Sequence, residues 1–369
     1  MTGLYVHIPF CESKCRYCGF FSCSGIFYMQ KDYFAALRRH VSALPKEKLD
    51  TVYLGGGTPS AVDAAHIGVL LDHIRNHFST SGEMECTIEI NPASATKDKL
   101  AAYRAFGINR VSIGAQSFLD AELAFLGRRH RAADIISCVE DVRAAGFSNV
   151  SLDLIYGLPG QSVSDFSKSV DRLLTLSPEH VSCYGLSFEP GTPLFSDLNA
   201  GKFAALSDDL YFEQYEYLRK TLAAHGYEHY EISNFARPGR RSLHNQIYWR
   251  AEPYYAVGAG ASAYFDGVRR TYTPDVPDYI KHPLKESEKE TVDRSGQMSE
   301  AVLLGLRLLT DGVDTAAFAA RFGRDIFDVF GKELEKHQKN GLLLYKNGRL
   351  LLTERAYYIS NYVLCDFVR

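Results

Sequence analysis

Short apolar runs alternate with amphipathic stretches along the first two thirds of the chain. Between these runs, apolar residues recur at helical spacing, as in Phe34, Leu37, Val41 and Leu44. Continuous apolar strands separated by helices are typical of βαβ units around a buried parallel sheet. The pattern therefore predicts an α/β fold with a partial (β/α)6 barrel of the TIM type over 1–235. We expect its strands at 4–8, 51–54, 86–90, 109–114, 149–156 and 180–187.

The character of the sequence changes after this barrel. The segment 236–296 contains a Gly- and Ala-rich stretch and ends in a polar run at 281–296, which is typical of a linker. Residues 297–369 hold helical patterns followed by two apolar runs around Asn347-Gly348, which is a hairpin signal. We expect a small α+β domain of winged-helix type with a docking or lid role, because its basic and acidic residues are balanced.

Charge and cysteine usage limit the possible partners and the compartment. The 369 residues include 41 basic and 44 acidic ones, a formal net charge of −3, which argues against nucleic acid as a partner. No apolar run approaches the ~20 residues that span a bilayer. Of the eight cysteines, the five outside the N-terminal eighteen residues are scattered and lie mostly in apolar stretches, as in a reduced intracellular chain. We therefore expect a cytoplasmic protein without disulfides.

Three cysteines, Cys11, Cys15 and Cys18, follow the first expected strand with the spacing C-x3-C-x2-C. A structural zinc site or an ordinary iron–sulfur site normally takes four protein ligands. Three thiolates on a 4Fe–4S cubane leave one iron open, and an open iron can hold a small molecule. The spacing therefore predicts such a cluster. Zinc with His7 as the fourth ligand and three unliganded thiols are the alternatives.

Polar or small residues also follow the second and third expected strands. Gly55-Gly56-Gly57-Thr58-Pro59 exposes bare backbone that a ligand can approach closely, and its carbonyl groups can accept from an ammonium group. It lacks the patterns of a phosphate-binding loop, although an unliganded tight turn remains an alternative. Glu89 offers two acceptors that suit the adjacent hydroxyls of a ribose, or it could cap the next helix.

Three further polar residues belong to the fourth and fifth units of the barrel. Gln116 follows the fourth strand, Arg128 lies in the helix after it, and Asp153 lies on the fifth strand. Each alone could be structural. Functional groups of such barrels gather at the carboxyl ends of the strands, so their recurrence there favours one shared site.

The runs YVHIPFC, GGGTPS, EINP, RVSIGAQSF and DLIYGLPGQ together resemble the radical S-adenosylmethionine (radical SAM) superfamily, in its coproporphyrinogen dehydrogenase-like branch. The resemblance implies that Cys11, Cys15 and Cys18 bind the 4Fe–4S cluster. It also implies a reduced cluster that donates one electron to S-adenosylmethionine, which yields methionine and a 5′-deoxyadenosyl radical. The S-adenosylmethionine site would then be lined by Tyr5, Gly56, Gly57, Thr58, Glu89, Gln116, Arg128 and Asp153.

Two features separate this chain from the dehydrogenases of that branch. Their cysteine pattern continues C-x2-C-x-C, but here Phe20 stands at the last of these positions. The run His244-Asn-Gln-Ile-Tyr-Trp249 is similar to the signature of a haem chaperone family within the branch, and a neutral imidazole is a good axial ligand for haem iron. In the alternative interpretation, His244 and Asn245 hold this segment to the barrel by hydrogen bonds, and Trp249 belongs to the core.

The resemblance implies a haem chaperone that binds haem as cargo and delivers it to haemoproteins such as respiratory cytochromes. It also implies an electron donor, and it allows a homodimer, acceptors that lie in a membrane and membrane association of the chaperone. The alternative function is that of a radical SAM enzyme acting on a tetrapyrrole, an oxygen-independent coproporphyrinogen III dehydrogenase. A zinc-binding winged-helix regulator is a third interpretation. Catalytic activity is left open, and no residue is assigned to catalysis.

Overall fold

The computed structural model describes the backbone of residues 1–369 and every side chain except those of 81 and 82. Within these residues, strands of the barrel and of the segment after it join into one twelve-stranded sheet with the order β12-β11-β10-β9-β1-β2-β3-β4-β5-β6-β8-β7. The six expected strands form its parallel part, in which each strand pairs with the next. These strands are β1 (Gly3–Ile8), β2 (Lys48–Gly56), β3 (Ser79–Ile90), β4 (Arg110–Gln116), β5 (Val150–Tyr156) and β6 (His180–Gly185).

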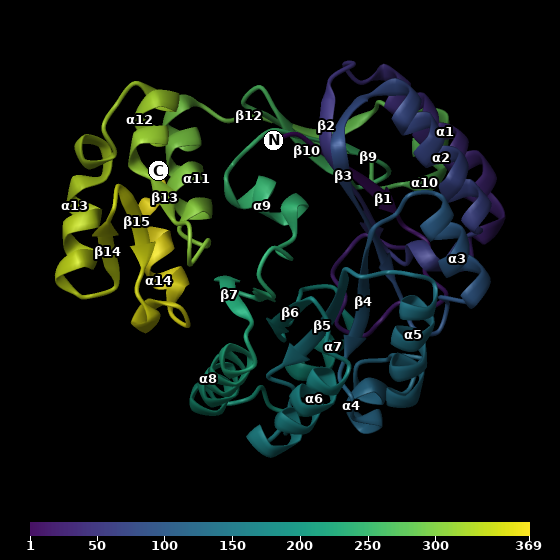
Figure 1. The fold of residues 1–369 in the computed structure, drawn as a ribbon, viewed down its shortest axis with the longest axis horizontal. Helices are drawn as coiled ribbons and strands as arrows, with labels where there is room; N and C mark the ends of the chain where they lie inside the picture. The colour runs from purple at the N-terminus through teal and green to yellow at the C-terminus, as the bar shows by residue number, and fades with distance from the viewer.

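Helices cover the outside of this curved sheet, as Figure 1 shows. Side-chain caps begin several of them; the hydroxyl of Ser162, for example, accepts from the backbone N–H of Asp165 at the start of α6. The sheet does not close, so the predicted partial barrel is confirmed. The helices and 3₁₀ turns of this part are η1 (Phe27–Met29), α1 (Gln30–Ala43), η2 (Pro59–Ala61), α2 (Ala64–His77), α3 (Lys97–Ala105), α4 (Asp120–Phe125), α5 (Ala132–Ala144) and α6 (Val163–Thr175).

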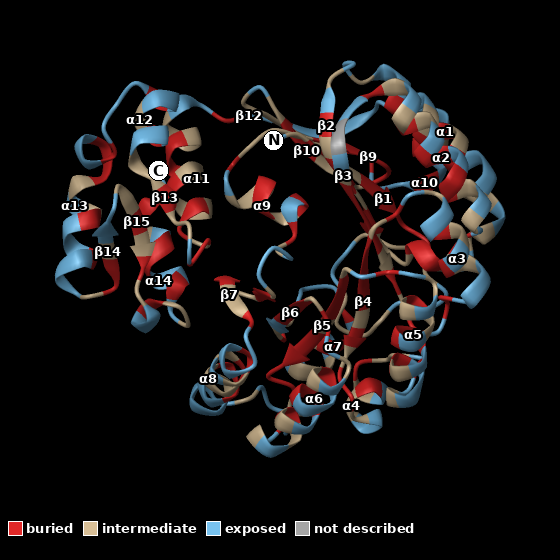
Figure 2. Cartoon of the chain, viewed as in Figure 1, coloured by how far each residue is buried: buried red, intermediate tan, exposed pale blue. Residues whose placement is uncertain are grey.

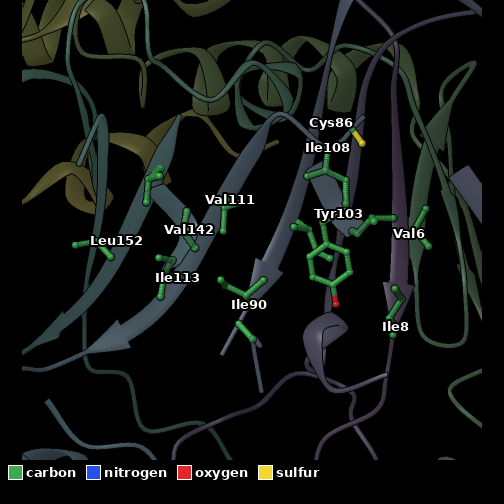
Figure 3. Close-up of a cluster of buried hydrophobic side chains, with 14 of the residues drawn as sticks. Val6, Ile8, Cys86, Ile90, Tyr103, Ile108, Val111, Ile113, Val142 and Leu152 are labelled. Carbon is green, nitrogen blue, oxygen red and sulfur yellow. The ribbon is translucent and has the colours of Figure 1, made fainter. Parts of the chain in front are cut away.

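The main core lies between the sheet and these helices. Figure 3 shows Val6 and Ile8 of β1, Val111 and Ile113 of β4, and Leu152 of β5 in it, and all five are buried. Because side chains alternate across a strand, the residues between them face the inside of the barrel. Polar groups occupy many of those positions. The strands are therefore apolar toward the helices and largely polar toward the interior, which is where a site can form.

The chain after β6 extends the sheet at both edges. Strands β7 (Glu228–Glu231) and β8 (Asn234–Ala236) join next to β6, while β9 (Tyr254–Val257) pairs in parallel with β1 at the other edge. Helix α9 (Leu243–Trp249) lies between these two additions. The remaining elements here are α7 (Pro193–Asn199), α8 (Asp208–Ala224), β10 (Ser262–Phe265), β11 (Val268–Tyr272) and α10 (Val276–Lys281).

The polar run 281–296, expected as a linker, instead contains strand β12 (Glu286–Thr291). Every residue of β12 is exposed (Figure 2), and the strand pairs antiparallel with β11 at the edge of the sheet. Arg269 of β11 contacts Glu290 at 2.7 Å, which helps to fix this register. A charged strand with no buried face lacks the apolar alternation that marks strands in a sequence, and charge is also how natural edge strands avoid further pairing.

The C-terminal part has a core of its own, built from residues such as Val302, Phe318 and Leu350. Its strands form a separate sheet with the order β13-β15-β14, next to helices, as expected for a winged-helix type (Figure 1). The domain boundaries at 235 and 296 stay predictions. The elements are α11 (Arg294–Gly305), β13 (Val313–Asp314), α12 (Thr315–Phe322), α13 (Ile326–Lys339), β14 (Leu343–Lys346), β15 (Arg349–Leu352), η3 (Glu354–Ala356), α14 (Ser360–Leu364) and η4 (Cys365–Phe367).

Two kinds of contact attach this part to the barrel side. Arg307 reaches the fully buried carboxylate of Glu231 on β7 at 2.8 Å, and the backbone N–H of Leu309 donates to the carbonyl of Tyr230 at 2.9 Å. Asp311 also accepts from Arg241 and Arg250. None of the described helices has the length and apolarity that crossing a bilayer requires.

Candidate functional site

One cavity of about 890 Å³ occupies the inside of the partial barrel, a volume that suits a large organic ligand. All twelve residues predicted for the site line it, so the structure brings together every one of them. They are Tyr5, Cys11, Cys15, Cys18, Gly56, Gly57, Thr58, Glu89, Gln116, Arg128, Asp153 and His244.

The loop with the three cysteines leaves the carboxyl end of β1 and is held in place by backbone hydrogen bonds. The N–H of Cys11 donates to the carbonyl of Cys23 at 2.9 Å, and the N–H of Cys23 donates to the carbonyl of Pro9 at 2.7 Å. Arg16, inside the loop, forms a 2.5 Å ion pair with Asp197 of α7. These contacts fix both ends of the loop, while the three thiols stay free and partly exposed to the cavity.

The surroundings of Cys11 and Cys18 favour the protonated thiol when no metal is bound. Burial raises the pKa of Cys11 and of Cys18, although the hydroxyl of Thr58, 3.4 Å from the Cys11 sulfur, acts in the opposite direction. Arg128 points its Nη1 at the sulfur of Cys15 at 3.4 Å. A bound metal would displace the thiol protons, and the guanidinium would then face a thiolate.

His7, the fourth ligand in the zinc alternative, is not placed to bind a metal. Its Nε2 bonds to the carbonyl of Phe21 at 2.9 Å and its Nδ1 to the hydroxyl of Tyr5 at 3.1 Å. Burial lowers its pKa to about 4, and the ring lies against Gly56, where an added Cβ would come within 2.6 Å of it. His7 therefore supports the glycine turn. No three His, Cys, Asp or Glu side chains among the described residues already surround one metal position.

The glycine turn after β2 packs closely on the cysteine loop. The N–H of Gly57 donates to the carbonyl of Ile8, and that of Thr58 to the carbonyl of Phe10, both at 2.9 Å. A Cβ on Gly57 would lie 2.8 Å from the carbonyl carbon of Pro9, closer than packing allows, and Gly56 has a φ of 109° that favours glycine. The glycines are thus required by contacts within the protein, and the same turn lines the cavity.

Glu89 faces the cavity from the end of β3. Its Oε1 accepts from the hydroxyl of Tyr53 at 2.8 Å and its Oε2 from the N–H of Gly56 at 3.2 Å. It does not cap the next helix, because Thr96 caps α3. Burial raises the pKa of Glu89 to about 7, with a further contribution from Asp153. The carboxylate is therefore held in a fixed orientation and is close to its titration point at neutral pH.

Three more site residues come from the β4 and β5 units. Gln116 adopts a φ of 69°, which is costly for a residue other than glycine and is often found at functional sites. Arg128 was expected in a helix, but it lies in the loop between α4 and α5, because α4 ends at Phe125. It donates to the carbonyl of Gly114 at 2.8 Å, and a Cβ at Gly114 would crowd both Gln116 and Arg128. Asp153 accepts from the hydroxyl of Ser112 at 3.1 Å, and burial raises its pKa.

His244 lies on α9, near the amino ends of the strands and far along the barrel from the cysteine loop. Its ring is buried and stacks on Tyr53 at a centroid distance of 5.1 Å. Its Nδ1 bonds to the hydroxyl of Thr51 at 2.7 Å and its Nε2 to that of Tyr248 at 2.8 Å. Burial lowers its pKa to about 3, with Arg110 adding to the effect. The imidazole is therefore neutral, and both of its nitrogens are hydrogen-bonded.

Trp249 faces away from the cavity, and the guanidinium of Arg307 lies 4.4 Å from its ring centre. The backbone N–H groups of Leu243 and His244 both donate to Glu85 of β3 at 3.0 Å, which fixes the start of α9 to the sheet. These contacts match the alternative in which this segment holds itself to the barrel. The same helix nevertheless lines the cavity through His244, Asn245 and Tyr248.

Reasoning from the sequence missed several residues that line the cavity: Tyr17, Tyr53, Arg110, Ser112 and Ser182. Four of them are strand residues that alternate with buried apolar ones, and this alternation was the available signal. It was hidden because each strand was treated as a continuous apolar run. Tyr17 lies between two of the cysteines and had no separate signal.

Comparisons with known proteins match both the barrel and the C-terminal part of the chain. The family model of the radical SAM superfamily matches residues 5–173, and that of the HemN C-terminal domain matches 292–359. The chain is 33% identical to the heme chaperone HemW of Bacillus subtilis over 100% of this chain and 99% of that protein. The HemW of Synechocystis is 36% identical over 85% of this chain and 80% of that protein.

A mitochondrial relative and a solved structure are also similar. The radical S-adenosyl methionine domain-containing protein 1 of Bos taurus is 33% identical over 93% of this chain and 82% of that protein. The solved structure of the coproporphyrinogen III oxidase HemN from Escherichia coli matches with a TM-score of 0.84, covering 99% of this chain and 89% of that chain. At 21% sequence identity, this match shows a shared fold.

Proposed function

Because this chain belongs to the radical SAM superfamily and, within it, to the family of the heme chaperone HemW, we propose that it binds haem and delivers it to haemoproteins such as respiratory cytochromes. A 4Fe–4S cluster and S-adenosylmethionine are part of the proposal, as are an electron donor, a cytoplasmic location and a homodimer. The observation that carries it is the similarity to HemW along the full chain, supported by one cavity that gathers all twelve predicted residues.

The residues of the cysteine loop suit the proposed cluster. When bound, a 4Fe–4S cluster with S-adenosylmethionine supplies one-electron chemistry at the sulfonium. In this chain, Cys11, Cys15 and Cys18 would each hold one iron, and the hydrogen bonds of the loop to Cys23 and Pro9 would limit its movement. Arg128 would offset the negative charge at Cys15.

The part of the cavity next to the cysteine loop suits S-adenosylmethionine. Glu89 would accept from the ribose hydroxyls, because the hydrogen bonds from Tyr53 and Gly56 already fix its carboxylate. The backbone at Gly56, Gly57 and Thr58 would meet the amino group. The buried Nε of Arg128 has no partner, so a ligand group can complete its hydrogen bonding. Tyr5, Gln116 and Asp153 would complete the pocket.

His244 is the proposed axial ligand of the haem iron. Its neutral ring is the form that binds metals, and the hydrogen bond of Nδ1 to Thr51 would orient the ring, as a group behind a metal ligand commonly does. Its Nε2 would have to exchange the hydroxyl of Tyr248 for iron. The proposal therefore requires Tyr248 to move when haem binds.

Anaerobic haem titration of the cluster-reconstituted protein, followed in the Soret region, tests this assignment. His244→Ala should weaken saturable binding by at least about tenfold, the loss of one strong polar contact. Tyr248→Phe should keep or strengthen binding, because it frees Nε2. Tyr254→Phe is the matched control, since Tyr254 packs against Tyr248 at 4.6 Å without lining the cavity.

The outcomes separate ligation from support of the fold. Binding that is unchanged in His244→Ala would move the haem elsewhere and refute this residue as ligand. Equal loss in His244→Ala and Tyr248→Phe would mean that the pair only holds α9 to the barrel. If wild-type protein takes up no haem, the chaperone function itself fails.

The alternative function is oxygen-independent coproporphyrinogen III dehydrogenation. Phe20, which replaces a cysteine of the dehydrogenase pattern, is 72% exposed and lines the cavity. Anaerobic incubation with coproporphyrinogen III and S-adenosylmethionine decides between the two functions. Protoporphyrinogen formed in proportion to the S-adenosylmethionine consumed would show that the protein is an enzyme and would refute a pure chaperone function.

A further inference from the structure

Arg110, the first residue of β4, is a buried cation that forms no side-chain hydrogen bond with any described residue. Its side chain is 2% exposed and lines the cavity. Its Nε is buried without a hydrogen-bond partner, and among the described residues its guanidinium forms no hydrogen bond or ion pair. Taking such a charge out of water is costly unless an opposite charge and hydrogen-bond acceptors are supplied.

Two acidic residues supply opposite charge to Arg110 but no hydrogen-bond acceptor. Glu89 and Asp153 both interact with Arg110 electrostatically. The oxygens of Glu89 already accept from Tyr53 and Gly56, and those of Asp153 from serine hydroxyls. No donor of Arg110 reaches either carboxylate. Their charges therefore make the position tolerable, and the guanidinium stays free to bind a ligand.

The register of the strands places Arg110 below the proposed S-adenosylmethionine site. Tyr53 pairs with Thr87, and Thr87 pairs with Arg110, so these three lie at one level of the barrel. Glu89 lies one level nearer to the carboxyl ends of the strands, and His244 stacks on Tyr53. Arg110 thus shares its end of the cavity with His244, on the side away from the cysteine loop.

We propose that Arg110 forms a carboxylate-binding subsite at the floor of the cavity, and that a propionate of the tetrapyrrole occupies it. This inference rests on the proposed haem-binding function. A guanidinium presents a planar fork of donors that matches a carboxylate with two parallel hydrogen bonds. Asn245, which also lines the cavity, offers a further donor at its wall.

A second carboxylate, that of the methionine part of S-adenosylmethionine, has the same chemistry. Its expected place is beside the cysteines, because the amino group on the same carbon would meet the turn at 56–58, which packs on the cysteine loop. The cysteines follow the carboxyl end of β1, whereas Arg110 begins β4. The two ligands would therefore occupy opposite ends of the cavity. The carboxylate bound by Arg110 would then be that of the tetrapyrrole.

Binding of haem and of haem dimethyl ester, in which both propionates are esterified, tests the subsite in cluster-reconstituted protein. Wild type should bind haem at least about tenfold more tightly than the ester, because the ester loses a charge-assisted pair. Arg110→Gln should bind haem about as weakly as the ester and should no longer discriminate between them. Arg129→Gln is the control, since Arg129 lines the exposed rim of the same cavity and pairs with Glu12.

A conservative variant and a second ligand keep the test decisive. Arg110→Lys retains the positive charge without the planar pair of donors, so its affinities for haem and for the ester should differ less than those of wild type. This variant replaces Arg110→Gln in the test if Arg110→Gln fails to unfold cooperatively. If a folded Arg110 variant still binds haem more tightly than the ester by the wild-type factor, the subsite is refuted but the haem-binding function is not. An S-adenosylmethionine affinity that falls tenfold in Arg110→Gln, with haem binding unchanged, would overturn the assignment to the tetrapyrrole.

Failure of the proposed function gives a different pattern. If wild type binds neither haem nor its ester, haem delivery is refuted and the S-adenosylmethionine titration alone decides the subsite. A tenfold loss there in Arg110→Gln would then support a carboxylate subsite for S-adenosylmethionine. No loss would overturn the subsite altogether.

Discussion

Replacing Glu89 by Gln should raise the stability of the ligand-free protein relative to wild type more at alkaline pH than at acidic pH. Burial raises the pKa of this carboxyl from 4.5 to about 7 in the folded state. As pH rises from 4.5 to 7, the unfolded chain releases this proton while the folded chain retains it, so the free energy of unfolding falls across that window. Above pH 7 the full cost of the buried charge is present, and Gln removes it.

The magnitude follows from the size of the shift. Each pKa unit corresponds to about 1.4 kcal/mol, so a shift from 4.5 to about 7 amounts to about 3 kcal/mol. Glu89 lines a cavity, and water there reduces the cost of its charge. The quantity to compare is the free energy of unfolding of Glu89→Gln minus that of wild type. We expect this difference to be about 1–3 kcal/mol larger at pH 8 than at pH 4.5.

Urea unfolding of cluster-free wild type and Glu89→Gln across this pH range measures the difference. Effects of Gln that do not depend on protonation shift the two curves by a constant amount, so only the pH-dependent part tests the argument. A difference that stays flat with pH, or one that grows toward acid, would refute the assigned burial cost. The same variant should bind S-adenosylmethionine about tenfold more weakly at pH 8, because the ribose loses a charged acceptor.

Two further predictions concern the cluster and the attachment of the C-terminal part. Single replacement by Ala of any cysteine in the N-terminal loop should abolish the brown colour and most of the bound iron, whereas Cys86→Ala, in the core, should not; full iron content in all three variants would contradict the cluster assignment. Arg307→Ala should lower the free energy of unfolding by about 2–4 kcal/mol, because it leaves the fully buried Glu231 unpaired. The exposed pair of Lys339 with Glu335 provides the control, and its loss should cost far less than the loss of the buried pair; equal effects of the two replacements would show that the buried pair does not stabilise the contact.

The parallel part of the sheet could be predicted because its strands carry a strong local signal. The runs at 4–8 and 149–156 are apolar enough to mark strands without knowledge of their partners. The charged strand β12 could not be predicted in this way, because its pairing with β11 and its ion pairs are decided by tertiary contacts. Local pattern indicates a strand only where one face is buried.

The gathering of the predicted residues around one cavity was predictable, but their contacts with one another were not. Motif spacing placed the cysteines and Glu89 at strand ends, and the fold brings those ends to one cavity. The hydrogen bonds of His244 to Thr51 and Tyr248 depend on how α9 meets the sheet, which no sequence pattern encodes. Arg110 escaped notice because strand register decides that its side chain faces the cavity.

The transfer of bound haem to a haem-free b-type cytochrome tests the central claim most directly. Haem-loaded, cluster-reconstituted protein would be mixed anaerobically with this acceptor, and in parallel with an equal concentration of apomyoglobin, which only captures haem that dissociates spontaneously. A chaperone predicts faster transfer to the cytochrome than to apomyoglobin. Equal rates would mean that haem merely dissociates, and would contradict delivery as the function of this protein.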